Sequence, residues 1–220
     1  MKKLVILFCS IVCTQLLFAQ EIDVKEKRDK IAGANNPVFT VLIYEADQSS
    51  VEKAWKSLMK DYNAKVSIKD EIFADNAAIS DISVNTIDVY AIVKKEETGI
   101  IKLIVAFDLG GTFLSSSTHS KESKAAEKII KKFAVNTSKK AVEEKLKEAK
   151  DKQKDLENDL SDLVKKNEKL HKQIEDYKNK ITENEKDIEK NIQEQEVASK
   201  AVDVQKTAVE EVNKKLNDIK

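Results

Sequence analysis

The segment NDLSDLVKKNEKLHKQIEDYKNKI, residues 158–181, carries the pattern that decides the architecture of this chain. Leu160, Leu163, Leu170 and Ile174 follow one another at steps of three, four or seven residues, and Ile181 continues the series. This spacing places them on one stripe of an α-helix and is typical of a coiled coil.

The same spacing runs without a skip from Leu146 to Ile219, so the sequence predicts a coiled-coil helix over residues 139–220. No glycine or proline interrupts the chain after residue 111. One continuous helix is therefore favoured over a hairpin that folds back near residues 184–199. The residues predicted to form the seam of the coiled coil are Leu146, Leu156, Leu160, Leu163, Asn167, Leu170, Ile174, Tyr177, Ile181, Ile188, Val202, Val209, Val212, Leu216 and Ile219.

Residue 167 is an asparagine, and it occupies an a position, which is the first position of its heptad. A buried amide there is satisfied when an equivalent asparagine faces it in a parallel, in-register pair of helices. This favours a parallel homodimer, with docking on another helical protein as the alternative. An alternative interpretation is that Asn167 is a partly exposed amide on a weak seam, because Asn184, Asn191, Gln195 and Gln205 also interrupt the stripe.

The part of the chain before the long helix has the composition of a small globular domain. All four glycines and the one proline precede residue 112. The segments 86–93 and 100–109 are rich in apolar, β-branched and aromatic residues and are joined by a turn at Gly99, which predicts a β-hairpin. With a strand at 38–46, a helix whose apolar face includes Trp55, and further strands between 66 and 79, the expected order is β-α-β-β-β-β-α. The predicted fold class is therefore α+β, a small antiparallel sheet with packed helices over residues 38–135, followed by the coiled-coil helix.

Several local features of this domain can be read more closely. Residues 20–37 are charged and are expected to be a lead-in linker. Ser49 and Glu52 have the spacing of a capping box at the start of the first helix. Asp75 and Asn76 are expected to turn the chain within the segment 71–79, and Asn136–Ser138 to bend or break the second helix.

The first nineteen residues have the pattern of a secretory signal peptide. Lys2 and Lys3 precede an apolar run over residues 4–19, and charged sequence follows at once. Cleavage between Ala19 and Gln20 would leave a mature chain located in the periplasm or cell envelope, or secreted. An uncleaved anchor and a lipoprotein modified at Cys13 are the alternatives. The two cysteines, Cys9 and Cys13, both lie in this run, so the mature chain would have no thiol.

Charge and residue pattern exclude several functional classes. The chain has 39 basic and 39 acidic residues, which argues against a general nucleic-acid binder. Neither His119 nor His171 has neighbours at metal-ligand spacing, and Gly110–Gly111 lacks the lysine of a phosphate loop. The sequence thus predicts no catalytic residue, no cofactor and no metal site.

The MKK start, the FAQ that ends the apolar run and the Lys/Asn/Ile-rich body resemble uncharacterised secreted envelope proteins of the Bacteroidota. The resemblance implies an exported protein and no particular activity. We therefore expect a non-enzymatic structural or interaction protein whose coiled coil mediates self-association or partner docking. The alternative is a periplasmic binding module whose α+β domain holds an apolar small molecule or a peptide.

Overall fold

The structure, a computed structural model, describes residues 21–218. The predicted signal peptide, its cleavage site at Ala19 and Gln20, and the last seam residue, Ile219, lie outside this range. The chain divides after Lys150 into two compact units, and the described part of the second unit, residues 151–218, is entirely helical.

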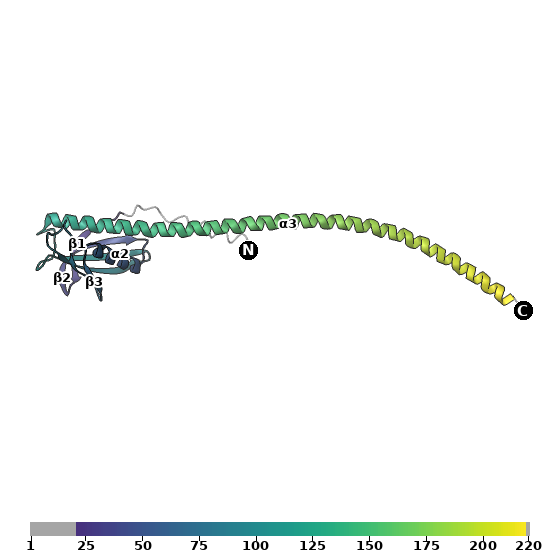
Figure 1. Ribbon diagram of the computed structural model, residues 1–220, viewed down its shortest axis with the longest axis horizontal. Coiled ribbons are helices and arrows are strands. Elements are labelled where there is room, and N and C mark those ends of the chain that lie inside the picture. Colours follow the sequence, from purple (N-terminus) through teal and green to yellow (C-terminus); the bar gives the residue numbers. More distant parts are fainter. Residues whose placement is uncertain (1–20, 219–220) are drawn as a thin grey trace. The chain divides into compact units, whose positions relative to one another are not determined.

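The first unit is an antiparallel sheet with helices, as predicted. Figure 1 shows its elements, which follow the order β1 (Lys25–Ile31), β2 (Ala34–Tyr44), α2 (Gln48–Asp61), β3 (Lys65–Ile68), β4 (Ile72–Ala77), β5 (Ile87–Glu97), β6 (Ile100–Asp108) and α3 (Ser120–Asp218). The strand order in the sheet is β1-β2-β6-β5-β4-β3, and every neighbouring pair is antiparallel. The α+β fold class is confirmed, with one strand more than the sequence indicated.

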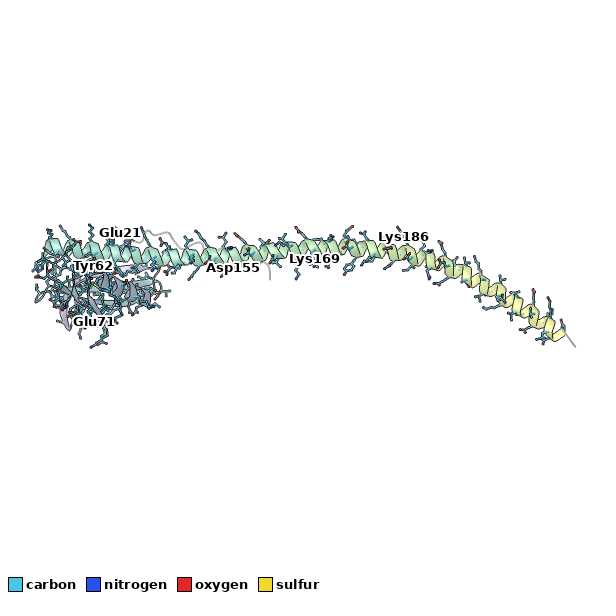
Figure 2. All side chains as sticks on the ribbon, in the orientation of Figure 1. Glu21, Tyr62, Glu71, Asp155, Lys169 and Lys186 are labelled. Carbon is cyan, nitrogen blue, oxygen red and sulfur yellow. The ribbon has the colours of Figure 1, made fainter. Side chains whose placement is uncertain are left out.

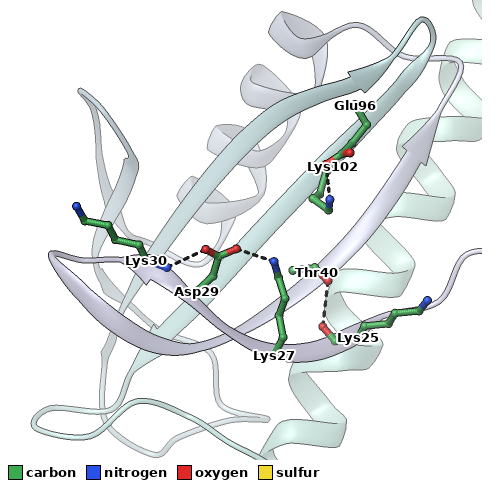
Figure 3. Close-up of polar contacts among 7 residues, drawn as sticks. All are labelled: Lys25, Lys27, Asp29, Lys30, Thr40, Glu96 and Lys102. Carbon is green, nitrogen blue, oxygen red and sulfur yellow. Dashed lines mark hydrogen bonds and ion pairs between the residues drawn. The ribbon is translucent and has the colours of Figure 1, made fainter.

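The additional strand corrects the prediction of a lead-in linker at residues 20–37. Strand β1 pairs along its whole length with β2, from Lys25 opposite Thr40 to Ile31 opposite Ala34. The prediction was wrong because KEKRDKI carries almost no apolar pattern, whereas pairing at the edge of a sheet needs only backbone groups. Charged side chains on such a strand also discourage further strands from adding to it. In Figure 3, Lys27 contacts Asp29 at 2.6 Å on this strand, and the Thr40 hydroxyl donates to the Lys25 carbonyl at 3.2 Å.

The predicted hairpin of β5 and β6 is confirmed. Ala91 lies opposite Val105, and Gly99 in the turn has a φ of 76°, which glycine adopts without strain. The expected turn at Asp75–Asn76 is instead a bulge. Strand β4 continues through it, the register shifts between Ala74 and Ala77, and Asn76 has a φ of 57°. Asparagine tolerates this left-handed conformation better than most residues, so a local irregularity replaces a turn.

The main core lies between one face of the sheet and the two helices. It includes the inward residues of the central strands, such as Val89, Leu103 and Phe107, together with residues of α2 and the start of α3. Trp55 is fully buried and meets Phe133 of α3 edge to face, with ring centroids 4.9 Å apart. The prediction that Trp55 belongs to the core is confirmed. A smaller apolar cluster on the opposite face consists of Ile31, Val38, Ile104 and Ala106.

The helices differ from the expected ones in two places, the start of α2 and residues 136–138 of α3. Asp47, not Ser49, caps the N-terminus of α2, since its carboxylate accepts the backbone N–H of Ser50 at 2.9 Å. The predicted break at 136–138 is absent, because α3 runs unbroken through these residues. Ser138 is buried there and bonds to the sheet, which explains a polar residue on an inward face.

Candidate interaction surface

The long helix α3 changes its surroundings along its length. Ser123, Ala126, Ile130, Phe133, Ala134 and Ser138 are buried within the α+β unit. From Val142 to Asp218, every residue of the helix is exposed. Within residues 21–218, nothing covers the apolar side chains of this exposed portion.

The predicted seam residues from Leu146 to Leu216 all lie on this exposed portion. The apolar ones include Leu160, of which 62% is exposed, and the others are similarly uncovered. An isolated helix gains little stability in water unless an apolar face packs against something. A stripe of large aliphatic side chains along a helix otherwise covered in charge is therefore a candidate interaction surface.

The polar positions of the stripe behave in two ways. The side-chain amide of Gln195 donates to Asn191 at 2.5 Å within the same helix, so this pair satisfies part of its own hydrogen-bonding capacity. Among the described residues, the Asn167 amide makes no side-chain hydrogen bond. The Asn167 amide therefore keeps its full capacity to pair with an equivalent group on a facing helix.

The rest of the helix surface is charged. Figure 2 shows Asp155, Lys169 and Lys186 projecting outward from α3 at positions outside the predicted seam. Ion pairs one turn apart include Asp162 with Lys165 at 3.3 Å. Such exposed pairs contribute little stability, but they keep these sides of the helix in water and leave the apolar stripe as the distinct surface.

The sequence-based list missed some exposed apolar residues of the same helix. Val142 lies seven residues before Ala149, which has the same heptad position as the seam residue Leu156, and 48% of Val142 is exposed. Extending the heptad spacing upstream of Leu146 would have found it. Val197 and Val204 are both 70% exposed, and with Ala201 and Ala208 they widen the apolar surface on one side of the seam.

The α+β unit carries three surface grooves beside its helices. A groove of about 690 Å³ between α2 and α3 has an apolar floor that includes Leu58, Phe133 and Ala141. A groove of about 590 Å³ lies nearby and contains Tyr62, whose phenol pKa is raised by burial and by Asp81 and Asp61. A third groove, again of about 690 Å³, lies beside Tyr44 and the Val135–Val142 stretch of α3.

The histidines and the glycine pair that the sequence analysis considered as possible chemical sites have ordinary local surroundings. The Nδ1 atom of His119 lies 2.8 Å from the Thr118 hydroxyl, and His171 is exposed on the helix. The backbone N–H groups of Gly110 and Gly111 donate to the Asp108 carboxylate at 3.0 and 3.1 Å. The Asp108 side chain therefore closes the turn that this glycine pair forms. Within residues 21–218, no three His, Cys, Asp or Glu residues gather closely enough to hold a metal ion.

No family model, curated protein or solved structure matches the chain. None of the helices in residues 21–218 combines the length and apolar character that crossing a bilayer requires.

Proposed function

We propose that this is an exported, non-enzymatic interaction protein in which an α+β domain is joined to a helix that self-associates as a parallel coiled coil. The observation that carries the proposal is the exposed apolar stripe of α3, which extends from Leu146 to Leu216. Burying large aliphatic side chains releases on the order of 1.5–3 kcal/mol each, so a few heptads are enough to hold two helices together.

The orientation follows from Asn167. In a parallel, in-register dimer its amide meets the same amide on the second copy, and each group finds a partner. In other registers it faces an apolar residue and loses its hydrogen bonds to water. The alternating Lys152 and Glu157 also pair across a parallel dimer, which adds a smaller preference for this register.

Export is part of the same proposal. It is supported by Lys2 and Lys3, the apolar run that follows them, and the location of both cysteines within the segment that cleavage after Ala19 removes. A chain without cysteine gains no disulfide in an oxidising compartment, so its assembly depends on non-covalent packing.

The test is sedimentation equilibrium of residues 20–220 at micromolar concentration. We expect a dimer, and we expect substitution of Leu163 and Leu170 by lysine to convert it to a monomer because charge would enter the seam. The matched control is Asp162→Lys, which adds a lysine on the charged side of the helix, outside the seam. A monomeric wild-type chain would overturn self-association, and crosslinking pull-down from the envelope would then test docking on another helical protein.

Orientation is tested with single cysteines in the same chain. Leu170→Cys and Val202→Cys should each form a disulfide-linked dimer, because a parallel register brings every seam position opposite itself. An antiparallel pair has one crossing point, so two positions so far apart in the helix cannot both crosslink. Crosslinking at a single position would contradict the parallel arrangement.

The groove between α2 and α3 favours one second candidate, a binding module. Its apolar floor beside a mixed rim, which includes Lys53, Asp61 and Glu144, has the character of a surface for a small apolar molecule or peptide. Native mass spectrometry of the purified chain checks this. A co-purifying molecule that is lost with Leu58→Glu would support it.

A further inference from the structure

The groove beside Tyr44 adjoins the apolar stripe of the long helix. It is lined by Ile22, Tyr44, Val135, Ser138 and Val142, with charged residues at its edge. Val142 and Val135 lie seven and fourteen residues before Ala149, which is a seam position. Because α3 is unbroken through this stretch, the heptad spacing carries the stripe into the groove.

The side of α3 that forms this groove is distinct from the side that packs on the sheet. Ala126, Ile130 and Ala134 are fully buried in the core. Val142 is half exposed, and Val135 is only partly buried. At 3.6 residues per turn, Val135 and Val142 point roughly a third of a turn or more away from the centre of this buried set. The domain therefore leaves the upstream end of the stripe open.

The walls of the groove are held in place. Lys131 of α3 forms an ion pair with Asp23 at 3.3 Å, which keeps the segment containing Ile22 beside the helix. The backbone of Tyr44 donates to the Ser138 hydroxyl at 3.0 Å, which fixes the end of β2 against the same helix. Two apolar side chains from outside α3 thus border the stripe.

We propose that the seam of the dimer begins inside the α+β domain, and that this groove receives the Val135–Leu146 stretch of α3 from a second copy. The inference rests on the proposed self-association. If Asn167 fixes a parallel register, an unbroken helix places Val142 opposite Val142 of the second copy, and Ile22 and Tyr44 flank the incoming helix.

Charge is compatible with a second copy as the occupant. A two-fold interface uses the same surface on both subunits, so that surface must be complementary to itself. The groove carries charges of both signs. Its positive residues are Lys131 and Lys139, and its negative residues are Glu21, Glu45 and Glu143. Lys139 occupies a seam position, where a single lysine is tolerated in two-stranded coiled coils and helps to fix the register.

The experiment uses residues 20–220 with one cysteine introduced at a time, since this chain has none of its own. Val142→Cys reports on the groove, Leu170→Cys on the stalk, and Lys140→Cys on a surface away from the seam. Disulfide formation under mild oxidation is read on a denaturing gel. Pyrene excimer emission from labelled protein is read in parallel, because it does not require disulfide geometry.

We expect a dimer signal from Val142→Cys and Leu170→Cys and none from Lys140→Cys. Signal from Leu170→Cys without either signal from Val142→Cys would overturn this inference and leave the proposed self-association intact. Absence of signal at both positions would overturn self-association itself. Equal signal at Lys140→Cys would indicate random collision and would also contradict the inference.

The groove wall is tested separately through Ile22→Ser. We expect the dissociation constant of the dimer to rise by about tenfold or more, because an apolar side chain leaves the interface. The control is Ile68→Ser, since Ile68 is an exposed residue of β3 outside the groove. An unchanged dissociation constant for Ile22→Ser, with the domain still folded by its thermal transition, would remove Ile22 from the interface.

Discussion

The backbone N–H of Tyr44 donates a hydrogen bond of 3.0 Å to the hydroxyl of Ser138, which lies 94 residues further along the chain. This bond joins the end of β2 to a point about five turns into α3, where the sequence suggested that the helix would break. Ser138 is buried. A single hydroxyl thus explains both the polar residue and the continuity of α3 through it.

Ser138→Ala should destabilise the α+β domain by about 1–3 kcal/mol, because the Tyr44 N–H would remain without its partner in a shielded place. Thermal unfolding of the chain, followed by circular dichroism and by the fluorescence of Trp55, measures the change. Ser161→Ala is the matched control, since Ser161 is exposed on the same helix. An equal effect from both substitutions would mean that helix propensity, and not the hydrogen bond, determines the result.

A fragment of residues 21–150 should unfold in one cooperative transition, because it contains all six strands, α2 and the buried turns of α3. A fragment of residues 36–135 should be much less stable, since it lacks β1 and Ser138. Chemical denaturation of the two fragments under the same conditions compares them. Equal midpoints would show that β1 adds no stability to the sheet.

Asn167→Ile in a peptide of residues 140–220 should raise the melting temperature and broaden the distribution of oligomers. The substitution replaces a buried polar pair with two apolar side chains, so stability rises while register and strand number are less well specified. Circular dichroism and light scattering measure the two effects. Asn158→Ile, at an exposed position outside the seam, is the control and should change neither. A wild-type peptide that stays monomeric at about tens of micromolar would contradict the homodimer.

Trp55→Ala should cost about 3–5 kcal/mol of folding free energy, because it leaves a cavity beside Phe133. Trp55→Phe should cost clearly less, for a reason beyond its size. The indole nitrogen is the one buried side-chain N or O atom without a hydrogen-bond partner in residues 21–218, so phenylalanine removes an unsatisfied donor. Urea unfolding of both variants gives the comparison, and equal losses would argue that the indole N–H is satisfied in solution.

Asp47→Ala should destabilise α2 by about 1 kcal/mol at neutral pH through loss of the N-cap. Hydrogen bonds from the Ser50 side chain and backbone hold the pKa of the Asp47 carboxyl below its usual value of 3.8. A lowered pKa in the folded state adds stability above pH 3.8, and this stability disappears as the pH falls through the folded value. The difference between wild type and Asp47→Ala, measured by thermal unfolding, should therefore shrink as the pH is lowered toward about 2. A constant difference would show that charge does not contribute to the cap.

The elements that could be predicted from the sequence are those whose burial leaves a periodic pattern. The hairpin of β5 and β6, the face of α2 around Trp55 and the long helix are of this kind. Strand β1 could not be predicted because six of its seven residues are charged and at least partly exposed at the edge of the sheet, and only Ile31 is buried. Its partner Thr40 lies in a strand whose own pattern is complete without β1. Asp47 and Ser49 compete as caps within two residues, and only the backbone conformation decides between them.

The stripe of α3 could be predicted because a heptad repeat is periodic, whereas its upstream end could not. Val135 and Val142 lie in the stretch where the helix passes from the core to the surface. In this stretch, residues that pack on the sheet alternate with residues of the heptad series. The groove walls are harder still to predict from the sequence, because Ile22 and Tyr44 come from segments far from α3 in the sequence and meet it only through tertiary contacts.

The order of strands in the sheet has a consequence for when the chain can fold. Strand β6 lies between β2 and β5, so Phe39 can pair only with Glu26 of β1 until Val105 is available on its other side. Pairings between residues so distant in the chain form slowly, because loop closure must precede the stabilising contacts. The domain therefore has no complete sheet until most of it has been synthesised, and no complete core until α3 follows.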